Sequence, residues 1–505
     1  MTAAPDLQIT SLKEALDCLL TADDAGRDSA FRALTALVWE GTPTPAAAGA
    51  VPLLRDGLAA SEGAPAALLA VLLGVLAEPA DDLGPAAAAA RSEVGEGLDL
   101  YLRLLAERRA DQAFTQALLY LVAHFPEHRA AVLEVADGLD LAETDHARLR
   151  RCLTERDPAN PGYGRQWPAP TVWALSDEEA SIDAMWMPDV PEEFGVNIFN
   201  NDTRMLLGYS GAKALGAIAG PIVGADTETA PEAAPLTGVR PPTGPLGAHA
   251  DAFACPDCRG VLRVEPGDAA VVCESCDTRF GTDEGYLDMP CSIDMGMIEY
   301  MLRDPVHVPR YEDGLRPAFL RVMGRNWDAR VTVADEHAYM AEHVAPADGP
   351  IVDIAAGAGR WTRLLAELVD PGRVVATDLS GPSLAQLQQA LPEVLAVRAN
   401  ALGLPFADGS VGALACWNAL QALMDPKAVV AEAGRCLRRG GSFTGLTFRP
   451  DADPVYRFFQ ARHEQALMCR LIDPDELRAW IEEAGMRVVD LSGPGTFLYF
   501  SAVKD

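Results

Sequence analysis

A turn built from small residues lies between a predicted strand and a predicted helix, and its spacing suits a nucleotide-like ligand. Residues 351–362 read IVDIAAGAGRWT, and their apolar start, with Asp353 inside it, predicts a buried strand. The turn follows with small residues at alternate positions: Ala355, Gly357 and Gly359. Nineteen residues after Gly359, a second predicted strand ends in Asp378, where a carboxylate can accept hydrogen bonds from both hydroxyls of a ribose.

The residue at position 362 distinguishes two kinds of ligand. A dinucleotide fingerprint needs glycine or alanine there for close helix–strand packing, and Thr362 hinders that packing. The form D-x-[GA]-x-G-x-G resembles instead motif I of the class I S-adenosylmethionine (SAM) methyltransferases. In that family the turn backs the amino-acid end of the cofactor. The resemblance implies that Asp353 orients this end from the strand.

The segments after the turn follow the order of the same family. Residues 397–406 resemble the strand-four segment that flanks the adenine, residues 411–417 predict the next strand, and residues 435–441 resemble the glycine turn before strand five. Two residues depart from the family's pattern, because Ala355 stands at the usual first glycine and Asn400 at a position that often holds an acid. The resemblance implies these cofactor-binding residues: Asp353, Ala355, Gly357, Gly359, Asp378, Leu379, Asn400, Ala401 and Trp417.

Four cysteines have the spacing of a metal site. They form C-x2-C-x14-C-x2-C, with each C-x-x-C pair placing two thiolates on one side of a tight turn: Cys255, Cys258, Cys273 and Cys276. Four protein ligands leave no open coordination position, so the pattern predicts a structural zinc in a small ribbon. Two disulfides or a redox C-x-x-C pair are the alternatives. They are disfavoured because the sequence shows no secretory signal and no adjoining thioredoxin-like βαβ unit.

A zinc ribbon ahead of this methyltransferase pattern resembles two groups of proteins. One is the bacterial rRNA guanine methyltransferases. The closer one is a set of plant plastid methyltransferases, whose similarity includes Y-E-x-G-x-R-x-x-F at residues 311–319 and covers about residues 253–503. In such proteins the helical segment before motif I closes over the cofactor, which implies a cap over the site here.

The catalytic residue is not visible in the sequence. Many class I enzymes that act on small molecules carry a histidine after strand four, and Ala422 stands at that place. The candidates for a general base are His463, Tyr311 and Glu312. An amine nucleophile or pure proximity catalysis would need no base.

The chain is long enough for several domains, and we predict a multidomain fold. An all-α N-terminal part, HEAT-like or an irregular bundle, precedes a zinc ribbon and an α/β Rossmann-like class I methyltransferase domain. The predicted parts are residues 1–156 (helical domain), 157–223 (irregular, with Trp167, Trp173 and Trp186), 224–250 (linker), 251–290 (ribbon), 291–345 (helical cap over the cofactor site) and 346–505 (methyltransferase domain). The helical domain is expected to serve stability or dimerisation, or to dock a peptide or carrier protein.

The amino-acid composition disfavours two classes of partner, nucleic acids and membranes. The chain has 41 basic and 73 acidic residues, a formal net charge of −32, which disfavours a nucleic-acid partner. Residues 251–288 hold nine acids against three arginines, so the ribbon shares this acidity. The longest apolar run, residues 66–77, is too short to span a membrane, and we predict a cytoplasmic protein without a membrane contact.

The sequence thus predicts a methyltransferase that binds SAM and a structural Zn²⁺. It predicts a small-molecule or peptide acceptor, in specialised (natural-product) metabolism. An rRNA base methyltransferase is one alternative. A SAM-binding scaffold or catalyst that transfers no methyl group is another.

Overall fold

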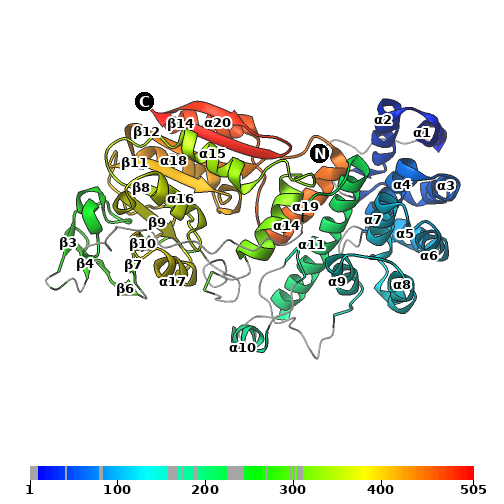
Figure 1. Ribbon diagram of the computed structural model, residues 1–505, viewed down its shortest axis with the longest axis horizontal. Coiled ribbons are helices and arrows are strands. Elements are labelled where there is room, and N and C mark those ends of the chain that lie inside the picture. Colours follow the sequence, from blue (N-terminus) through cyan, green and yellow to red (C-terminus); the bar gives the residue numbers. More distant parts are fainter. Residues whose placement is uncertain are drawn as a thin grey trace.

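The computed structural model describes residues 9–39, 42–78, 84–156, 169–172, 176–186, 192–224, 244–265, 267, 270–283, 285–295, 298, 302–303 and 311–505. Figure 1 shows an elongated molecule with a cluster of short helices at one end and a sheet with its flanking helices at the other. Helices α11, α14 and α19 lie between these two parts (Figure 1). Their bounds are Glu192–Ala219, Arg316–Met323 and Pro454–Leu467.

The N-terminal part is helical, as predicted. Its elements are α1 (Ile9–Thr21), α2 (Asp24–Thr35), β1 (Val38–Trp39), β2 (Thr42–Pro43), α3 (Ala47–Ala60), α4 (Gly63–Ala77), α5 (Gly84–Gly95), α6 (Leu98–Glu107), α7 (Gln112–Val122), η1 (Pro126–His128), α8 (Arg129–Ala136) and α9 (Glu143–Cys152). Helix α4 is the apolar run, and every residue from Ala66 to Ala77 is buried. Gly74 allows α7 to approach, because a Cβ there would lie 2.4 Å from a ring carbon of Tyr120.

One predicted helix of this part is wrong. Apolar spacing predicts a single helix from Val94 to Glu107, but the structure has two, α5 ending at Gly95 and α6 beginning at Leu98. Gly97 lies at the N-cap of α6 and separates them. Apolar spacing continues across the break because both helices face the same core, so spacing alone did not detect it.

Helix α11 contradicts the prediction that residues 157–223 are irregular. It has 28 residues and four glycines, which suggested breaks in the sequence. The glycines serve packing instead: a Cβ at Gly211 would lie 2.3 Å from the ring of Phe459, and one at Gly216 would lie 2.6 Å from the ring of Trp327. Helix α10 (Asp177–Trp186) also falls in this segment. Trp167, Trp173 and linker residues 225–243 lie outside the described residues.

A nine-stranded sheet forms the C-terminal part, in the order β13-β14-β12-β11-β8-β9-β10-β7-β6. Strands β8 to β12 are parallel to one another, and β14 runs antiparallel beside β12. The strands are β6 (Thr282–Asp283), β7 (Tyr286–Asp288), β8 (Ile351–Ile354), β9 (Val374–Asp378), β10 (Leu395–Arg398), β11 (Val411–Trp417), β12 (Leu437–Phe448), β13 (Met486–Ser492) and β14 (Phe497–Lys504). Apart from β6 and β7, this is the Rossmann-like arrangement that motif I predicts.

Helices and short turns connect these strands. They are η4 (Tyr311–Leu315), α15 (Val333–His343), α16 (Arg360–Leu368), η5 (Pro371–Arg373), α17 (Gly381–Ala390), η6 (Leu420–Ala422), α18 (Pro426–Cys436) and α20 (Pro474–Glu483). The predicted glycine turn at residues 435–441 is a bulged start of β12, because Val411 pairs with Leu437 and Ala413 already pairs with Ser442.

The ribbon consists of η3 (Gly247–Ala252), β3 (Leu262–Val264), β4 (Val271–Cys273) and β5 (Arg279–Phe280). Its strands form a separate antiparallel sheet. The end of the segment predicted as ribbon, however, joins the larger sheet, since β7 pairs with β10 in parallel. Phe253 also bridges to Phe406, so the ribbon and the methyltransferase domain share hydrogen bonds.

No helix in the described ranges has both the length and the apolar character needed to cross a membrane.

Candidate cofactor and metal sites

A cavity of about 270 Å³ opens where the order of the parallel strands reverses, beyond the carboxyl ends of β8, β9 and β11. Open α/β sheets bind ligands at this point, because the chain leaves the two central strands in opposite directions. Seven of the predicted cofactor residues line the cavity: Ala355, Gly357, Asp378, Leu379, Asn400, Ala401 and Trp417. The structure therefore brings most of the predicted site together around one opening.

The glycine turn gives the cavity its floor. Gly357 has a φ of +55°, and a Cβ there would meet nothing within 4 Å, so its backbone faces open space. Gly359, with a φ of +94°, precedes α16 and does not line the cavity; a Cβ there would lie 2.8 Å from the Leu387 side chain of α17. Ala355 also has a positive φ, +56°, a conformation that strains any residue with a Cβ. The turn thus needs glycine at two places and carries a strained alanine at a third.

Asp353 lies beneath the cavity and does not line it. Its side chain is 1% exposed, and one carboxylate oxygen accepts a 2.6 Å hydrogen bond from the Thr362 hydroxyl. Burial raises the pKa of Asp353 to about 7, against the lowering effect of the Thr362 hydrogen bond. This bond ties β8 to the first turn of α16, and Thr362, which stands at the place of a third glycine, supplies it. The contact between Asp353 and the cofactor stays a prediction.

Asp378 braces the glycine turn. Its two carboxylate oxygens accept hydrogen bonds from the backbone amides of Gly357 and Ser380, each at 2.8 Å. Burial raises the pKa of Asp378, and these amides oppose the rise. A carboxylate has about four acceptor positions, so two remain for ligand hydroxyls. The ribose contact stays a prediction.

Asn400 closes another side of the cavity. Its side-chain oxygen accepts a hydrogen bond from the amide of Leu402 at 3.0 Å, and its amide nitrogen lies 3.0 Å from the sulfur of Met295. Met295 belongs to the segment predicted as a cap, which also places Tyr311 and Glu312 at the cavity. Glu312 pairs with Arg360 at 2.7 Å, at the start of α16.

A buried ion pair attaches this cap to the sheet. Arg316 of α14 and Glu336 of α15 pair at 2.6 Å, and each side chain is 1% exposed. Glu336 also accepts a 2.8 Å hydrogen bond from the indole of Trp417, which lines the cavity. The Arg316 guanidinium lies 5.1 Å from the ring centre of Trp361. Sequence analysis missed Glu336 because no motif marked α15, whereas Arg316 belongs to the resemblance at residues 311–319.

The three candidates for a general base differ in position. Tyr311 and Glu312 line the cavity, but His463 does not. His463 is buried in α19 against α11, where a Cβ at Gly208 would lie 3.3 Å from its Nδ1. Burial lowers the pKa of His463 to about 4. The candidate role of His463 is therefore wrong, because the histidine faces the helical domain.

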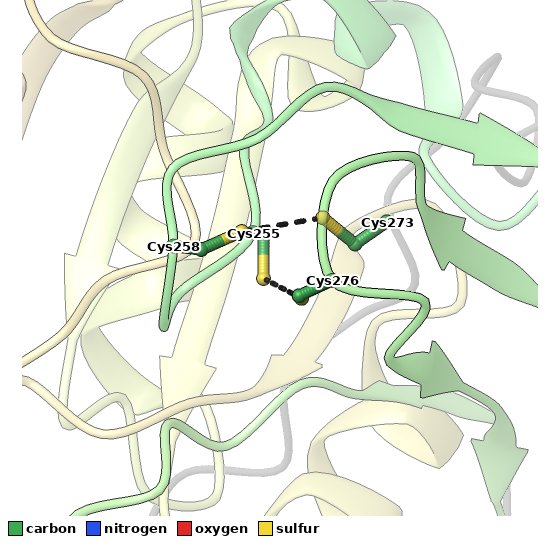
Figure 2. A group of neighbouring side chains, drawn as sticks. All are labelled: Cys255, Cys258, Cys273 and Cys276. Carbon is green, nitrogen blue, oxygen red and sulfur yellow. Dashed lines mark hydrogen bonds between the residues drawn. The ribbon is translucent and has the colours of Figure 1, made fainter.

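The four cysteines converge as predicted. Their sulfurs all lie within 4.8 Å of one another, and Figure 2 shows the two pairs facing each other across two turns. The closest cross-pair distances are 3.4 Å for Cys258 and Cys273 and 3.7 Å for Cys255 and Cys276. A tetrahedral zinc with bonds of about 2.3 Å has sulfur–sulfur edges of roughly 3.8 Å. The donor set thus fits zinc, and all four thiols are free of disulfides.

Known proteins resemble the C-terminal part. Residues 352–444 match a family described as "Methyltransferase domain". An uncharacterised chloroplastic methyltransferase of Arabidopsis thaliana is 28% identical over 280 residues, which cover 50% of this chain and 78% of that protein. A demethylmenaquinone methyltransferase of Lactiplantibacillus plantarum is 32% identical over 146 residues, or 27% of this chain and 58% of that protein. The solved geranyl diphosphate C-methyltransferase of Streptomyces coelicolor is 16% identical, with coverage of 34% and 77% and a TM-score of 0.30.

The sheet order and the glycine turn with its cavity agree with these sequence matches. Together they identify the C-terminal part of the chain as a class I SAM-dependent methyltransferase.

Proposed function

We propose that the enzyme methylates a small-molecule or peptide acceptor in specialised metabolism. The observation that carries the proposal is that one cavity is lined both by seven of the predicted cofactor residues and by the cap residues Met295 and Tyr311. A cofactor on the glycine turn would place its reactive end toward the cap. The matches to quinone-biosynthesis enzymes, such as the demethylmenaquinone methyltransferase, support a small-molecule acceptor.

Bound SAM supplies an electrophilic methyl group, so the chain has to align the acceptor and exclude water. Two residues at the cavity bear on proton removal. Burial and the nearby Glu312 raise the pKa of Tyr311 to about 12, which keeps its phenol neutral near pH 7. Glu312 is held in its ion pair with Arg360. Both features favour alignment without a strong general base.

Two of the ribbon's three arginines support a small acceptor over rRNA. Arg259 pairs with Glu432 of α18 at 3.0 Å, and Arg279 pairs with Glu265 at 2.6 Å. Both side chains thus have an acid beside them within the protein, which weakens an attraction to phosphate. The excess of acidic residues in the sequence also disfavours rRNA as the acceptor.

Asp378 provides the test of the cofactor site. Asp378→Ala removes both the brace on Gly357 and the predicted ribose acceptor, so we expect SAM affinity in calorimetry to fall about tenfold or more. Asp328→Ala is the matched control, because Asp328 is half-exposed and pairs with Arg330. Unchanged SAM affinity in Asp378→Ala would contradict the ribose assignment. SAM binding without methyl transfer to any tested acceptor would favour a non-methylating role.

We further propose that the cysteine cluster holds a structural zinc. Metal analysis of the purified chain should find one zinc per chain, and Cys273→Ser should lower it and the thermal stability together. Cys291→Ser is the control, since Cys291 lies outside the cluster. A metal-free protein with unchanged stability would contradict this proposal.

A further inference from the structure

Part of the cavity is lined, among the described residues, by uncharged side chains only. The cavity's charged lining residues, within the described ranges, are Glu312 and Asp378. Both are occupied on the cofactor side, Glu312 by Arg360 and Asp378 by backbone amides. The cavity is also lined by apolar side chains from the cap, the loop after β11 and the end of α19: Ile298, Leu302, Leu423, Met424 and Met468. We call this apolar part of the cavity the methionine chamber.

Hydrogen bonds hold two walls of the methionine chamber together. The side-chain amide of Gln421 donates to the carbonyl of Asn418 at 2.8 Å, and its oxygen accepts from the Thr447 hydroxyl at 3.0 Å. The backbone amide of Arg470 donates to the carbonyl of Gln421 at 2.8 Å. The loop that carries Met424 and the segment that carries Met468 are therefore linked, so these two walls of the chamber are preformed.

The mouth of the methionine chamber is apolar as well. Met424 is 54% exposed and Met468 is 55% exposed, although both line the cavity. Exposed apolar side chains at the rim of a pocket are available to contact a ligand that covers them. Methionine suits a ligand of irregular shape, because its unbranched thioether adapts to many surfaces and contacts aromatic rings well.

We propose that the methyl acceptor is an uncharged, mainly apolar small molecule that fills the methionine chamber and covers Met424 and Met468. This inference rests on the proposed methyltransferase function and narrows its substrate class. A phosphate or carboxylate on the acceptor would enter the chamber without a cationic partner among the described lining residues, and burying such a charge is unfavourable. Burying an uncharged apolar molecule in the chamber is favourable, because its apolar surface leaves water.

The test uses the full chain saturated with S-adenosylhomocysteine, which fills the cofactor side. The probe is N-phenyl-1-naphthylamine, an uncharged compound whose fluorescence rises in apolar sites. We expect saturable binding that weakens about tenfold in Met424→Asp and in Met468→Asp, because each places a carboxylate against the probe. Met424→Leu should keep the affinity within about twofold.

Met185→Asp is the matched control. Met185 lies in α10 and is 67% exposed, but it does not line the cavity. All variants should bind S-adenosylhomocysteine within about twofold of the unchanged chain. A chain that binds S-adenosylhomocysteine but not the probe would overturn the acceptor class and leave the proposed function standing. So would equal affinity for the anion 1-naphthyl phosphate. A chain that fails to bind S-adenosylhomocysteine would contradict the proposed function itself.

Discussion

Two side chains at the end of β8 illustrate how single residues shape the cofactor site. Ala355 lines the cavity with a left-handed backbone, and Asp353, two residues earlier in β8, is buried with a raised pKa. Both are unfavourable in isolation, since a left-handed alanine is strained and a buried carboxylate lacks solvent. Such local costs concentrate at functional sites, where neighbouring structure holds the residue in place.

Replacement of Ala355 by glycine should stabilise the protein. Glycine removes a strain of about 1–2 kcal/mol and loses part of this gain to its freer unfolded chain, so we expect a net increase of roughly 0.5–1 kcal/mol in the free energy of unfolding. Ala356→Gly is the control, because Ala356 is buried without a positive φ and should lose stability. Urea unfolding measures both. An equal change in the free energy of unfolding in the two variants would show that the backbone of Ala355 is not strained.

The pKa of Asp353 predicts a dependence of stability on pH. Its folded value, about 7, lies above the unfolded value near 4, so the folded state binds the extra proton. The contribution of this group is therefore complete below pH 4 and is lost as the pH rises toward 7. We expect Asp353→Asn to remove this loss while keeping an acceptor for Thr362. Unfolding curves at pH 5 and pH 8 should converge in the variant, and an unchanged pH slope would exclude the raised pKa.

At the scale of elements, α14 and α15 are held on the sheet by one buried ion pair. Arg316 donates to Glu336, while its Nε and Nη1 have no hydrogen-bond partner among the described residues. Glu336 also holds the Trp417 indole at the cavity wall. The pair thus fixes the cap and a wall of the cavity at once.

Glu336→Gln should be strongly destabilising. It removes the carboxylate paired with the buried Arg316 guanidinium, and breaking a buried ion pair typically costs about 3–5 kcal/mol. Glu342→Gln on the same helix is the control, because Glu342 is exposed. Thermal unfolding gives the stability, and Trp417 fluorescence reports the cavity wall. A loss below about 1 kcal/mol would show that the charge is neutralised in another way.

The sequence predicted strands and side-chain clusters correctly where one feature, such as a continuous apolar run or a cysteine spacing, was strong. The strand at residues 411–417 has the predicted bounds because a strand buried on both faces reads as a continuous apolar run. Cysteine spacing likewise predicted the convergence of four sulfurs. Helix α11 was missed since its glycines look like breaks until Phe459 and Trp327 are seen against them. The candidate role of His463 was also wrong, because sequence does not reveal which way a side chain points.

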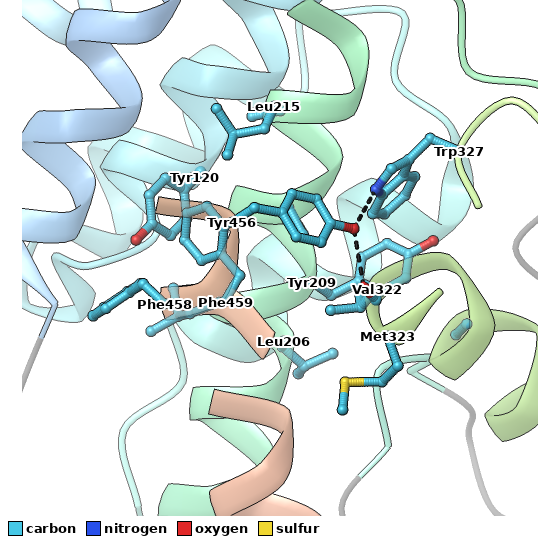
Figure 3. Packing of buried hydrophobic residues seen from close by; sticks show 14 of the residues in the cluster. Tyr120, Leu206, Tyr209, Leu215, Val322, Met323, Trp327, Tyr456, Phe458 and Phe459 are labelled. Atoms are coloured by element: carbon cyan, nitrogen blue, oxygen red, sulfur yellow. Dashed lines mark hydrogen bonds between the residues drawn. The ribbon is translucent and has the colours of Figure 1, made fainter. Parts of the chain in front are cut away.

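At the scale of the molecule, α11 joins the helical part to the enzyme. Figure 3 shows Tyr209 of α11 packed near Trp327 and Tyr456, with Tyr120 of α7 beside Phe459 of α19. The indole of Trp327 donates to the Tyr456 hydroxyl at 2.8 Å within this cluster. Helix α19 then runs from this interface to Leu467 and Met468 at the cavity. The helical part therefore supports a wall of the acceptor site.

Gly211→Leu tests this connection. The new side chain collides with Phe459, so we expect a loss of about 1–3 kcal/mol in stability and weaker binding of apolar probes. S-adenosylhomocysteine affinity should change less, because the glycine turn lies on other elements. Gly195→Ala in the same helix is the control, since a Cβ there meets nothing within 4 Å. Equal losses for both ligands would contradict a selective link to the acceptor wall.

The strands β6 and β7 have a consequence for self-association. They lie outside β10, so the backbone of β10 pairs on both sides, and the outermost strand, β6, has only two residues. At the opposite edge, β13 pairs irregularly with β14 between Val488 and Asp490. Short or bulged edge strands are poor templates for another chain. Both margins of the nine-stranded sheet therefore resist edge-to-edge aggregation, and at one of them the protection comes from a segment that directly follows the cysteine cluster.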